Sequence, residues 1–327
     1  MRSGGLGSRS AATLAPSAFL ASAVSTLEIQ NAILAQTFHN PADPEIAKAI
    51  AAWQTLTKES PPIQVSQHKQ RSWDDAIIKE IYSNLLASAT SDLDKARLMS
   101  VKQPHAGDWL LAPPITSVGL RMSDEEVRIS AGVRLGARLC QPHTCVCGTK
   151  VDARGIHGLS CRKNAGRQIR HNSINDIVWR AMRRAGIPSI KEPLGLLRDD
   201  GKRPDGVTMI PWNRGRCLAW DVTVPDTFAA THLPLTSITP SAAADRAANN
   251  KKMKYQILTQ THTFTPLAVE TTGAYNSEAS QFLQDIGRRC TEATGDIKET
   301  AYLFQQVSVA IQRGNALSIR GTLISAT

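Results

Sequence analysis

The sequence predicts an α+β protein in which a mostly helical N-terminal region precedes a mixed sheet flanked by helices. Apolar residues recur at helical spacing through residues 1–138. Four cysteines then crowd into one short stretch, and strand-like runs separated by turn residues follow them. We therefore expect four parts: a helical region at 1–138, a compact Cys/His module at 139–165, an α/β domain with a helical tail at 166–315, and a C-terminal tail at 316–327.

Composition and charge narrow the class of protein. The chain has 327 residues, of which 42% are hydrophobic and 20% charged, which is typical of a globular protein and not of a disordered one. Its net charge of +10 favours a polyanionic partner. No apolar run approaches the roughly 18 residues that a membrane span needs, so we expect no membrane partner.

Cysteine usage indicates the compartment. The uneven placement of the six cysteines argues against a secreted disulfide scaffold and favours a reducing, intracellular setting, nuclear or cytoplasmic. Residues 1–30 are rich in serine and alanine and have no acid before Glu28, so a transit peptide is an alternative for this segment.

The N-terminal region, residues 1–138, contains sequence patterns typical of helix starts. Asp43-Pro44 suits an N-cap followed by a first-turn proline, and Ser123 to Glu126 is close to a capping box. The apolar stripes are expected to form a core, and nothing in the region suggests catalysis. We predict helical structure at 13–35, 44–57, 73–100 and 123–138, the third with a stripe of Trp73, Ile77, Ile78, Ile81, Leu85 and Leu86.

The second half of the chain contains both helix-like and strand-like segments. A basic helix is predicted at 166–185, with one apolar face and a stop at Gly186 to Pro188. Two strands joined by a turn at Asn213 to Gly215 follow it. The remaining predicted elements are strands at 203–210, 217–224 and 264–271, and helices at 241–258, 277–293 and 297–313.

The cysteine cluster has the spacing of a metal site. Cys145, Cys147, His157 and Cys161 give C-x-C-x9-H-x3-C, four nitrogen and sulfur donors that suit tetrahedral zinc. Since four protein donors leave no open position, such a zinc ion would be structural. The first pair is shorter than the usual C-x2-C, so His143 or Cys140 could replace one ligand. The alternative is a segment with free thiols.

Two aspartates are brought together by the predicted hairpin. Asp205 and Asp221 each lie eight residues from Asn213, so they would be cross-strand neighbours on one face. Adjacent carboxylates repel each other, but they become useful when a divalent cation such as Mg²⁺ lies between them. The alternative is a surface hairpin with two solvated acids.

Cations near this pair could assist phosphate chemistry. Lys251 and Lys254 share a face of the predicted helix at 241–258, with Tyr255 beside them. A lysine at the metal site could stabilise developing negative charge or orient the attacking water. The alternative is a solvated basic face. Residues 162–216 also hold thirteen Lys and Arg against five acids, which predicts a nucleic-acid surface beside the acidic site.

The order of these features resembles a known family. The Cys-x-Cys…His…Cys cluster, Arg170-His171-Asn172, Arg203-Pro-Asp205, Asp221 and the Lys254-Tyr255 pair resemble the C-terminal end of site-specific non-LTR retrotransposon proteins. In that family a CCHC zinc knuckle precedes a restriction-like endonuclease of the PD-(D/E)XK class. The resemblance implies a restriction-endonuclease-like core and an enzyme that nicks DNA with magnesium to prime reverse transcription.

The resemblance also implies roles for particular residues. Asp205 matches the aspartate of the PD motif, Asp221 the second metal ligand, and Lys254 or Lys251 the catalytic lysine. The sequence departs from the class at Thr223, where the motif has lysine, so activity depends on a lysine from the later helix. Glu192 is a weaker candidate for a further acid. We assign nucleic-acid contact to Arg167, Arg170, His171 and Arg203, with target DNA as the partner and element RNA as a second candidate.

The resemblance covers about residues 140–315. Gly4 to Gly7 resembles the segment after the polymerase thumb in such proteins, but no YxDD-type motif occurs, so no reverse transcriptase activity is expected. The main alternative is a DNA- or RNA-binding remnant with a decayed catalytic site. A helical structural protein with incidental cysteines would leave the order of the motifs unexplained. The first two hypotheses differ in whether a lysine reaches the two aspartates.

Overall fold

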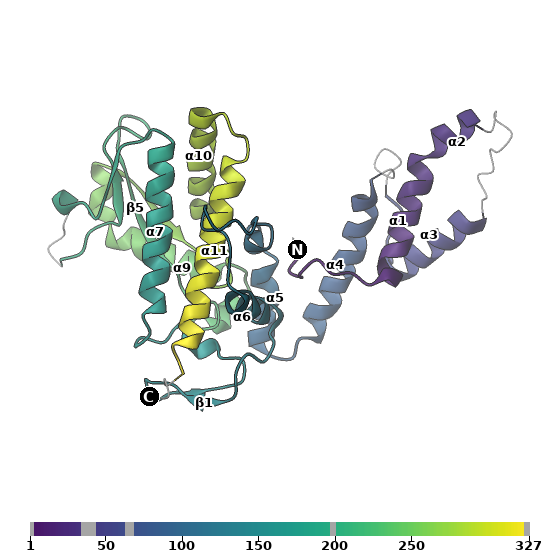
Figure 1. Cartoon of the computed structure of the whole chain (residues 1–327), viewed down its shortest axis with the longest axis horizontal. Coiled ribbons are helices and arrows are strands. Elements are labelled where there is room, and N and C mark those ends of the chain that lie inside the picture. The colour runs from purple at the N-terminus through teal and green to yellow at the C-terminus, as the bar shows by residue number, and fades with distance from the viewer. Residues whose placement is uncertain (1–2, 34–43, 63–68, 197–200, 324–327) are drawn as a thin grey trace. The chain divides into compact units, whose positions relative to one another are not determined.

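The computed structural model describes residues 3–33, 44–62, 69–196 and 201–323, and it has the mixed α/β character that the sequence predicts (Figure 1). The chain forms two compact units, Gly7–Ala89 and Met1–Leu6 together with Thr90–Thr327. This division differs from the boundary expected at residue 138. Residues 90–138 belong to the second unit because their helices pack against elements from the C-terminal half.

The first unit is a small helical bundle closed around two tryptophans. The Trp53 and Trp73 rings meet edge to face with centroids 5.2 Å apart, and Trp53 Nε1 donates to the Trp73 carbonyl at 3.0 Å. Leu20 packs against this buried pair. The unit contains α1 (Ala11–Ser25), α2 (Leu27–Ile33), α3 (Pro44–Thr57) and α4 (Gln70–Ser88).

The helical structure predicted over 73–100 is two helices, α4 and α5 (Asp92–Val101). The break has a local cause, because the Ser91 hydroxyl accepts the amide of Asp94 at 3.1 Å and caps α5. The predicted apolar stripe of α4 is buried only in its first half. Trp73 and Ile77 are buried, whereas Leu85 is 51% exposed.

The helix predicted at 123–138 is α6 (Asp124–Leu135), and its predicted capping box is confirmed. The Ser123 hydroxyl accepts from the Glu126 amide, and the Glu126 carboxylate accepts from the Ser123 amide at 2.7 Å. The helix ends three residues early because Gly136 adopts a left-handed conformation with φ of 73°. The short 3₁₀ helix η2 (Asp108–Leu110) lies between α5 and α6 in the chain and contacts α11 (Glu299–Arg320).

A four-stranded sheet forms the centre of the second unit. Its order is β3 (Ser189–Lys191), β4 (Gly206–Thr208), β5 (Leu218–Thr223) and β6 (Thr263–Ala268). The first two pairings are antiparallel, and β5 and β6 are parallel. The parallel connection passes through α8 (Leu233–Thr236), α9 (Ala242–Lys254) and η5 (Gln256–Gln260).

Side-chain alternation along β5 separates the two faces of the sheet. Leu218, Trp220 and Val222 point into a core shared with α7 (Gly166–Arg184), α10 (Ser277–Thr294) and α11. The opposite face is covered by α9, whose Ala244 and Ala248 pack on β6. Asp221 follows the period of this second face, so the strand presents it to the helix that carries the lysines.

The C-terminal helix α11 runs along α7 and extends to the Cys/His module (Figure 1). The tail predicted at 316–327 is therefore wrong in its first part, because residues 316–320 continue α11 and Ala316 and Ile319 are buried. A Cβ on Gly158 would lie 2.6 Å from the Ser318 carbonyl oxygen, so glycine is required for the module to approach α11. In the described part of the chain, no helix is long and apolar enough to cross a membrane.

Candidate functional site

The hairpin between β4 and β5 brings the two predicted aspartates together. Its register pairs Gly206 with Trp220 and Val207 with Ala219, and the next step places Asp205 opposite Asp221. The Asp205 amide donates to the Trp220 carbonyl at 2.9 Å, which holds this end of the hairpin closed. The strands are shorter than predicted, and Asp205 lies immediately before β4.

A histidine from α7 completes the cluster. One ligand atom each from His171, Asp205 and Asp221 lies within 4.8 Å of the others. His171 Nε2 is 3.0 Å from Asp205 Oδ2, and the same oxygen accepts the Val222 amide at 2.6 Å. We predicted His171 as a nucleic-acid contact, whereas the structure places it beside the carboxylates.

Sequence reasoning missed Asn175, which fixes α7 to the hairpin. Its side chain donates to the Asp205 carbonyl at 3.1 Å and accepts from Trp220 Nε1 at 2.9 Å. Asn175 and His171 are four residues apart and share a helix face. A polar residue on the otherwise apolar face of α7 was the signal that could have identified it.

Both predicted lysines of α9 approach Asp221. Lys251 Nζ donates to Asp221 Oδ1 at 2.5 Å, whereas Lys254 Nζ is 3.9 Å from the other carboxylate oxygen. Lys254 also donates to the Tyr255 hydroxyl at 2.7 Å, and that hydroxyl donates to the Arg203 carbonyl at 2.6 Å. Lys251 is therefore the closer cation, and the Lys254-Tyr255 pair supports the segment that precedes Asp205.

The site concentrates negative charge away from water. Asp221 is 2% exposed, and burial together with the neighbouring Asp205 raises its pKa although Lys251 opposes the shift. Burial alone would lower the pKa of His171, but its hydrogen bond to Asp205 and the charge of that carboxylate outweigh burial and raise it. A cation placed between the carboxylates would relieve this repulsion.

Two of the predicted nucleic-acid contacts are engaged within the protein. Arg170 is 1% exposed, donates to Asn315 Oδ1 at 2.7 Å and to the Leu159 carbonyl, and burial lowers its pKa to about 10. Its assignment to DNA is therefore wrong, because the guanidinium joins α7 to α11 in the core. Arg203 forms an ion pair with the exposed Glu192, so Glu192 adds no acid to the cluster.

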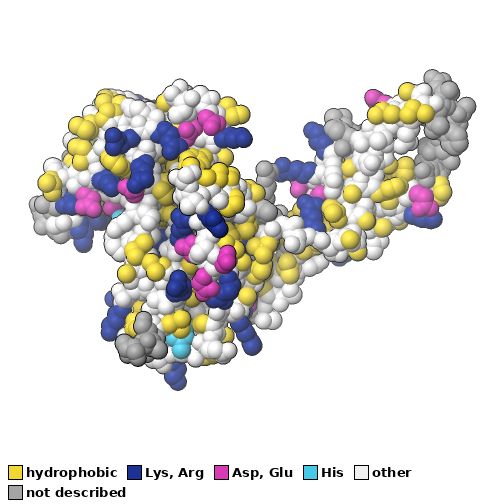
Figure 2. All heavy atoms as spheres, viewed as in Figure 1, with side chains coloured by type: hydrophobic (Ala, Val, Ile, Leu, Met, Phe, Trp, Pro, Cys, Tyr) yellow, Lys and Arg dark blue, Asp and Glu magenta, His cyan; other side chains and the backbone are white. Residues whose placement is uncertain are grey.

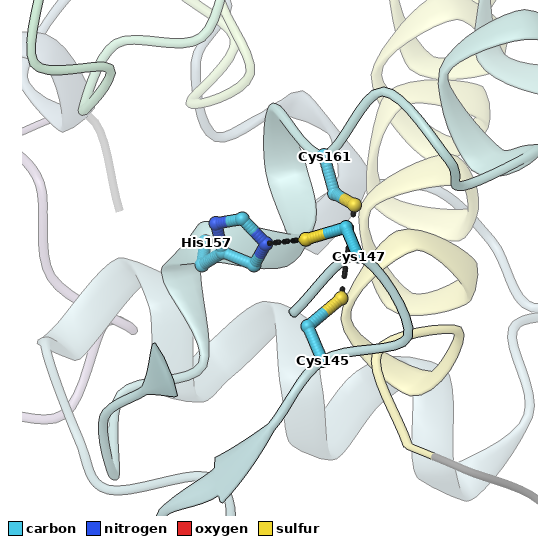
Figure 3. Close-up of side chains that lie close together, drawn as sticks. All are labelled: Cys145, Cys147, His157 and Cys161. Carbon is cyan, nitrogen blue, oxygen red and sulfur yellow. Dashed lines mark hydrogen bonds between the residues drawn. The ribbon is translucent and has the colours of Figure 1, made fainter. Parts of the chain in front are cut away.

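The Cys/His module forms a second cluster (Figure 3). It contains the hairpin β1 (His143–Thr144) and β2 (Lys150–Val151) and the 3₁₀ helix η3 (Ile156–Leu159). The sulfurs of Cys145 and Cys161 are 3.7 Å apart, and Cys147 Sγ is 3.2 Å from His157 Nε2. An edge of about 3.8 Å follows from Zn–S bonds of about 2.3 Å in a tetrahedron, so these residues could hold a metal ion such as zinc.

Neither alternative ligand joins this cluster. His143 Nε2 is 2.9 Å from the Thr322 hydroxyl, next to the end of α11, and Cys140 Sγ lies near the Asp152 carbonyl at 3.4 Å. Hydrogen bonding with the Thr149 side chain and backbone lowers the pKa of Cys147 to about 6, so this thiol is disposed to act as thiolate.

Adding one methyl group at Gly206 is expected to destabilise the protein strongly. A Cβ at this position would lie 2.0 Å from the fully buried Trp220 ring, so Gly206→Ala forces the hairpin or the tryptophan to move. We expect a loss of about 2–3 kcal/mol in the free energy of unfolding, measured by urea denaturation. Gly195→Ala is the control, since a Cβ at that position would have no atom within 4 Å and its φ is not positive. Equal effects of the two substitutions would contradict the prediction.

Comparison with known proteins gives no independent assignment. No model of a protein family matches the sequence, and no curated protein is significantly similar to it.

Proposed function

We propose that this chain is a metal-dependent DNA endonuclease with a restriction-like core, derived from a non-LTR retrotransposon protein. The observation that supports it best is the convergence of the β4–β5 hairpin and α9 on one site. The hairpin supplies Asp205 and Asp221, and α9 supplies Lys251, whose amine lies 2.5 Å from Asp221. Two carboxylates that could hold a metal ion and a lysine that could stabilise negative charge suit metal-assisted cleavage of a phosphodiester.

The donor set fits a divalent cation. Carboxylate oxygens of Asp205 and Asp221 suit Mg²⁺, which would polarise the scissile phosphate and lower the pKa of a bound water. Lys251 would stabilise negative charge that develops on the phosphate. His171 holds Asp205 through Nε2 and so fixes the direction of that carboxylate.

Lys251 could replace the motif lysine that is absent at Thr223. The class motif places its lysine two residues after the second acid, whereas here that position is threonine. Because Asp221 faces α9, a lysine from that helix reaches the same carboxylate from a different element. The mixed sheet flanked by helices is also compatible with a restriction-like core.

The Cys/His module would serve this enzyme as a structural zinc knuckle. Its four donors leave no open position for a substrate, and its close packing on α11 holds it at the end of α7. Target DNA would be the substrate, and element RNA a second partner of the basic surface.

The test is nicking of supercoiled plasmid by the full chain with Mg²⁺. We expect the wild-type protein to convert plasmid to open circles and Asp205→Asn to be inactive. Lys251→Met and Lys252→Met form a matched pair, because Lys252 is the adjacent lysine and pairs with Glu278 instead of the site. Only Lys251→Met should lower the rate, by about 10²-fold.

Two results would overturn the proposal. A wild-type protein that binds DNA but does not nick it would leave the decayed binding remnant as the better hypothesis. Nicking that survives Asp205→Asn would place the activity elsewhere in the chain or in a contaminant.

A further inference from the structure

Ion pairs within the protein reduce the positive charge that the basic residues of 162–216 can offer to a polyanion. On the face that carries α7 and α11, Lys and Arg side chains are interspersed with Asp and Glu (Figure 2). Arg180 and Lys191 both pair with Asp176, and Arg184 pairs with Glu299. These cations are already neutralised, so their count overstates the positive charge available for a ligand.

Two arginines, one just before α7 and one in its first turn, are different. Arg162 and Arg167 are exposed, and neither guanidinium forms an ion pair or a hydrogen bond with the described residues. In the sequence they lie between Cys161, the last donor of the Cys/His cluster, and His171, which lies beside Asp205 and Asp221. Some of the unpaired positive charge is therefore located between the two sites.

A cavity connects these arginines to the cluster of His171, Asp205 and Asp221. Its volume is about 390 Å³, and Arg162, Arg167, His171 and Lys251 lie in its wall together with the buried Arg170. No carboxylate is among the described residues that line it. A pocket with this lining next to Asp205 and Asp221 suits an anion that must lie beside a metal site.

A second cavity continues from the first. It has a volume of about 220 Å³ and shares Arg162, Arg167 and Val224 with its neighbour. Leu159 and Ser160 of the Cys/His module are among the residues that line it. Asp226 is the acid in its lining, and the carboxylate is directed to internal donors, the Phe228 amide and the Thr271 hydroxyl.

The lining indicates how a nucleic acid would be recognised here. Neither cavity has a Phe, Tyr or Trp side chain among its described lining residues on which a base could stack. Cationic and small polar groups contact phosphates, whereas sequence is read at base edges. The two cavities therefore suit a chain of phosphates and not a particular base sequence.

We propose that the two cavities form one groove for the phosphodiester backbone of a DNA strand, in which Arg162 and Arg167 bind the phosphates next to the one cleaved. The inference rests on the proposed function for the identity of the scissile site. It assigns the binding energy to two residues outside the carboxylate–lysine cluster. The groove would hold the strand with little regard to sequence and with strong dependence on salt.

The test measures binding separately from cleavage. Fluorescence anisotropy of a labelled single-stranded oligonucleotide is recorded with the full chain in Ca²⁺ in place of Mg²⁺, over a range of salt concentrations. Arg162→Gln/Arg167→Gln is compared with Arg121→Gln/Lys298→Gln, which removes the same charge from exposed residues that line neither cavity. The groove variant should bind about 10-fold more weakly or worse, with a salt slope smaller by about one to two.

Each outcome separates the groove from the catalytic proposal. The charge-matched control should change affinity by less than about 2-fold, and equal losses in both variants would overturn the groove in favour of a general charge effect. Sequence-dependent binding, or unchanged affinity of the groove variant, would also overturn it. If the wild type binds through the groove but never nicks plasmid, the groove stands and the endonuclease proposal fails.

Discussion

Asp221→Asn is expected to lower the rate of plasmid nicking about 10³-fold while leaving the protein at least as stable as the wild type. The substitution keeps the shape of a residue that is 2% exposed but removes its charge. A neutral amide is a poor ligand for Mg²⁺, so the proposed metal site loses one of its two carboxylates. Nicking rates of the two proteins with Mg²⁺ test the expected loss of activity. Urea unfolding curves recorded without added Mg²⁺ test the expected stability.

The stability half follows from the raised pKa of Asp221. Burial and the adjacent Asp205 raise the folded-state pKa above the ordinary value of 3.8, so the folded protein binds this proton more tightly than the unfolded chain. The contribution of this group to stability is therefore lost as pH rises from 3.8 through the folded-state pKa. The advantage of the Asp221→Asn variant over the wild type should grow over the same interval.

A control distinguishes this effect from a change in net charge. Asp124→Asn alters an exposed acid in the first turn of α6, outside the site, and should leave the nicking rate unchanged. If Asp221→Asn were instead strongly destabilised, Asp221 would be a structural ion-pair partner of Lys251, and its assignment as a metal ligand would lose its support.

The sequence predicted the parts of the two clusters that depend on local spacing. Asp205 and Asp221 could be paired because a hairpin is symmetric about its turn, and the observed register keeps that symmetry. The four donors of the Cys/His cluster were identified by their spacing, and the structure brings Cys145, Cys147 and His157 together with Cys161. In both cases the relevant contacts form within one short segment.

The errors at the site involve contacts between residues that are distant in the sequence. Arg170 has the same side chain as Arg167, and only the packing of α11 shows that the first is buried against Asn315, 145 residues away. The role of Asn175 depends in the same way on Trp220. Helix periodicity defines which residues share a face, but it does not identify the element that covers this face.

Loss of metal from the Cys/His cluster is expected to destabilise the whole second unit. Cys147→Ser should abolish stoichiometric zinc and lower Tm by about 8–16 °C, which corresponds to roughly 4 kcal/mol in a unit of this size. Gly158 packs against Ser318, so a module that loosens also exposes buried residues of α11 such as Ile319. Zinc content by mass spectrometry and Tm by calorimetry measure the two effects.

Cys140→Ser is the matched control for this prediction. Both thiols are half-buried in the same module, but the Cys140 sulfur lies near the Asp152 carbonyl, outside the four donors. Cys140→Ser should therefore keep its zinc and nearly all of its Tm. Equal losses in the two variants would mean that Cys140 also binds the metal. Because Leu159 and Ser160 of the module line the proposed groove, Cys147→Ser should also weaken DNA binding, whereas Cys140→Ser should not.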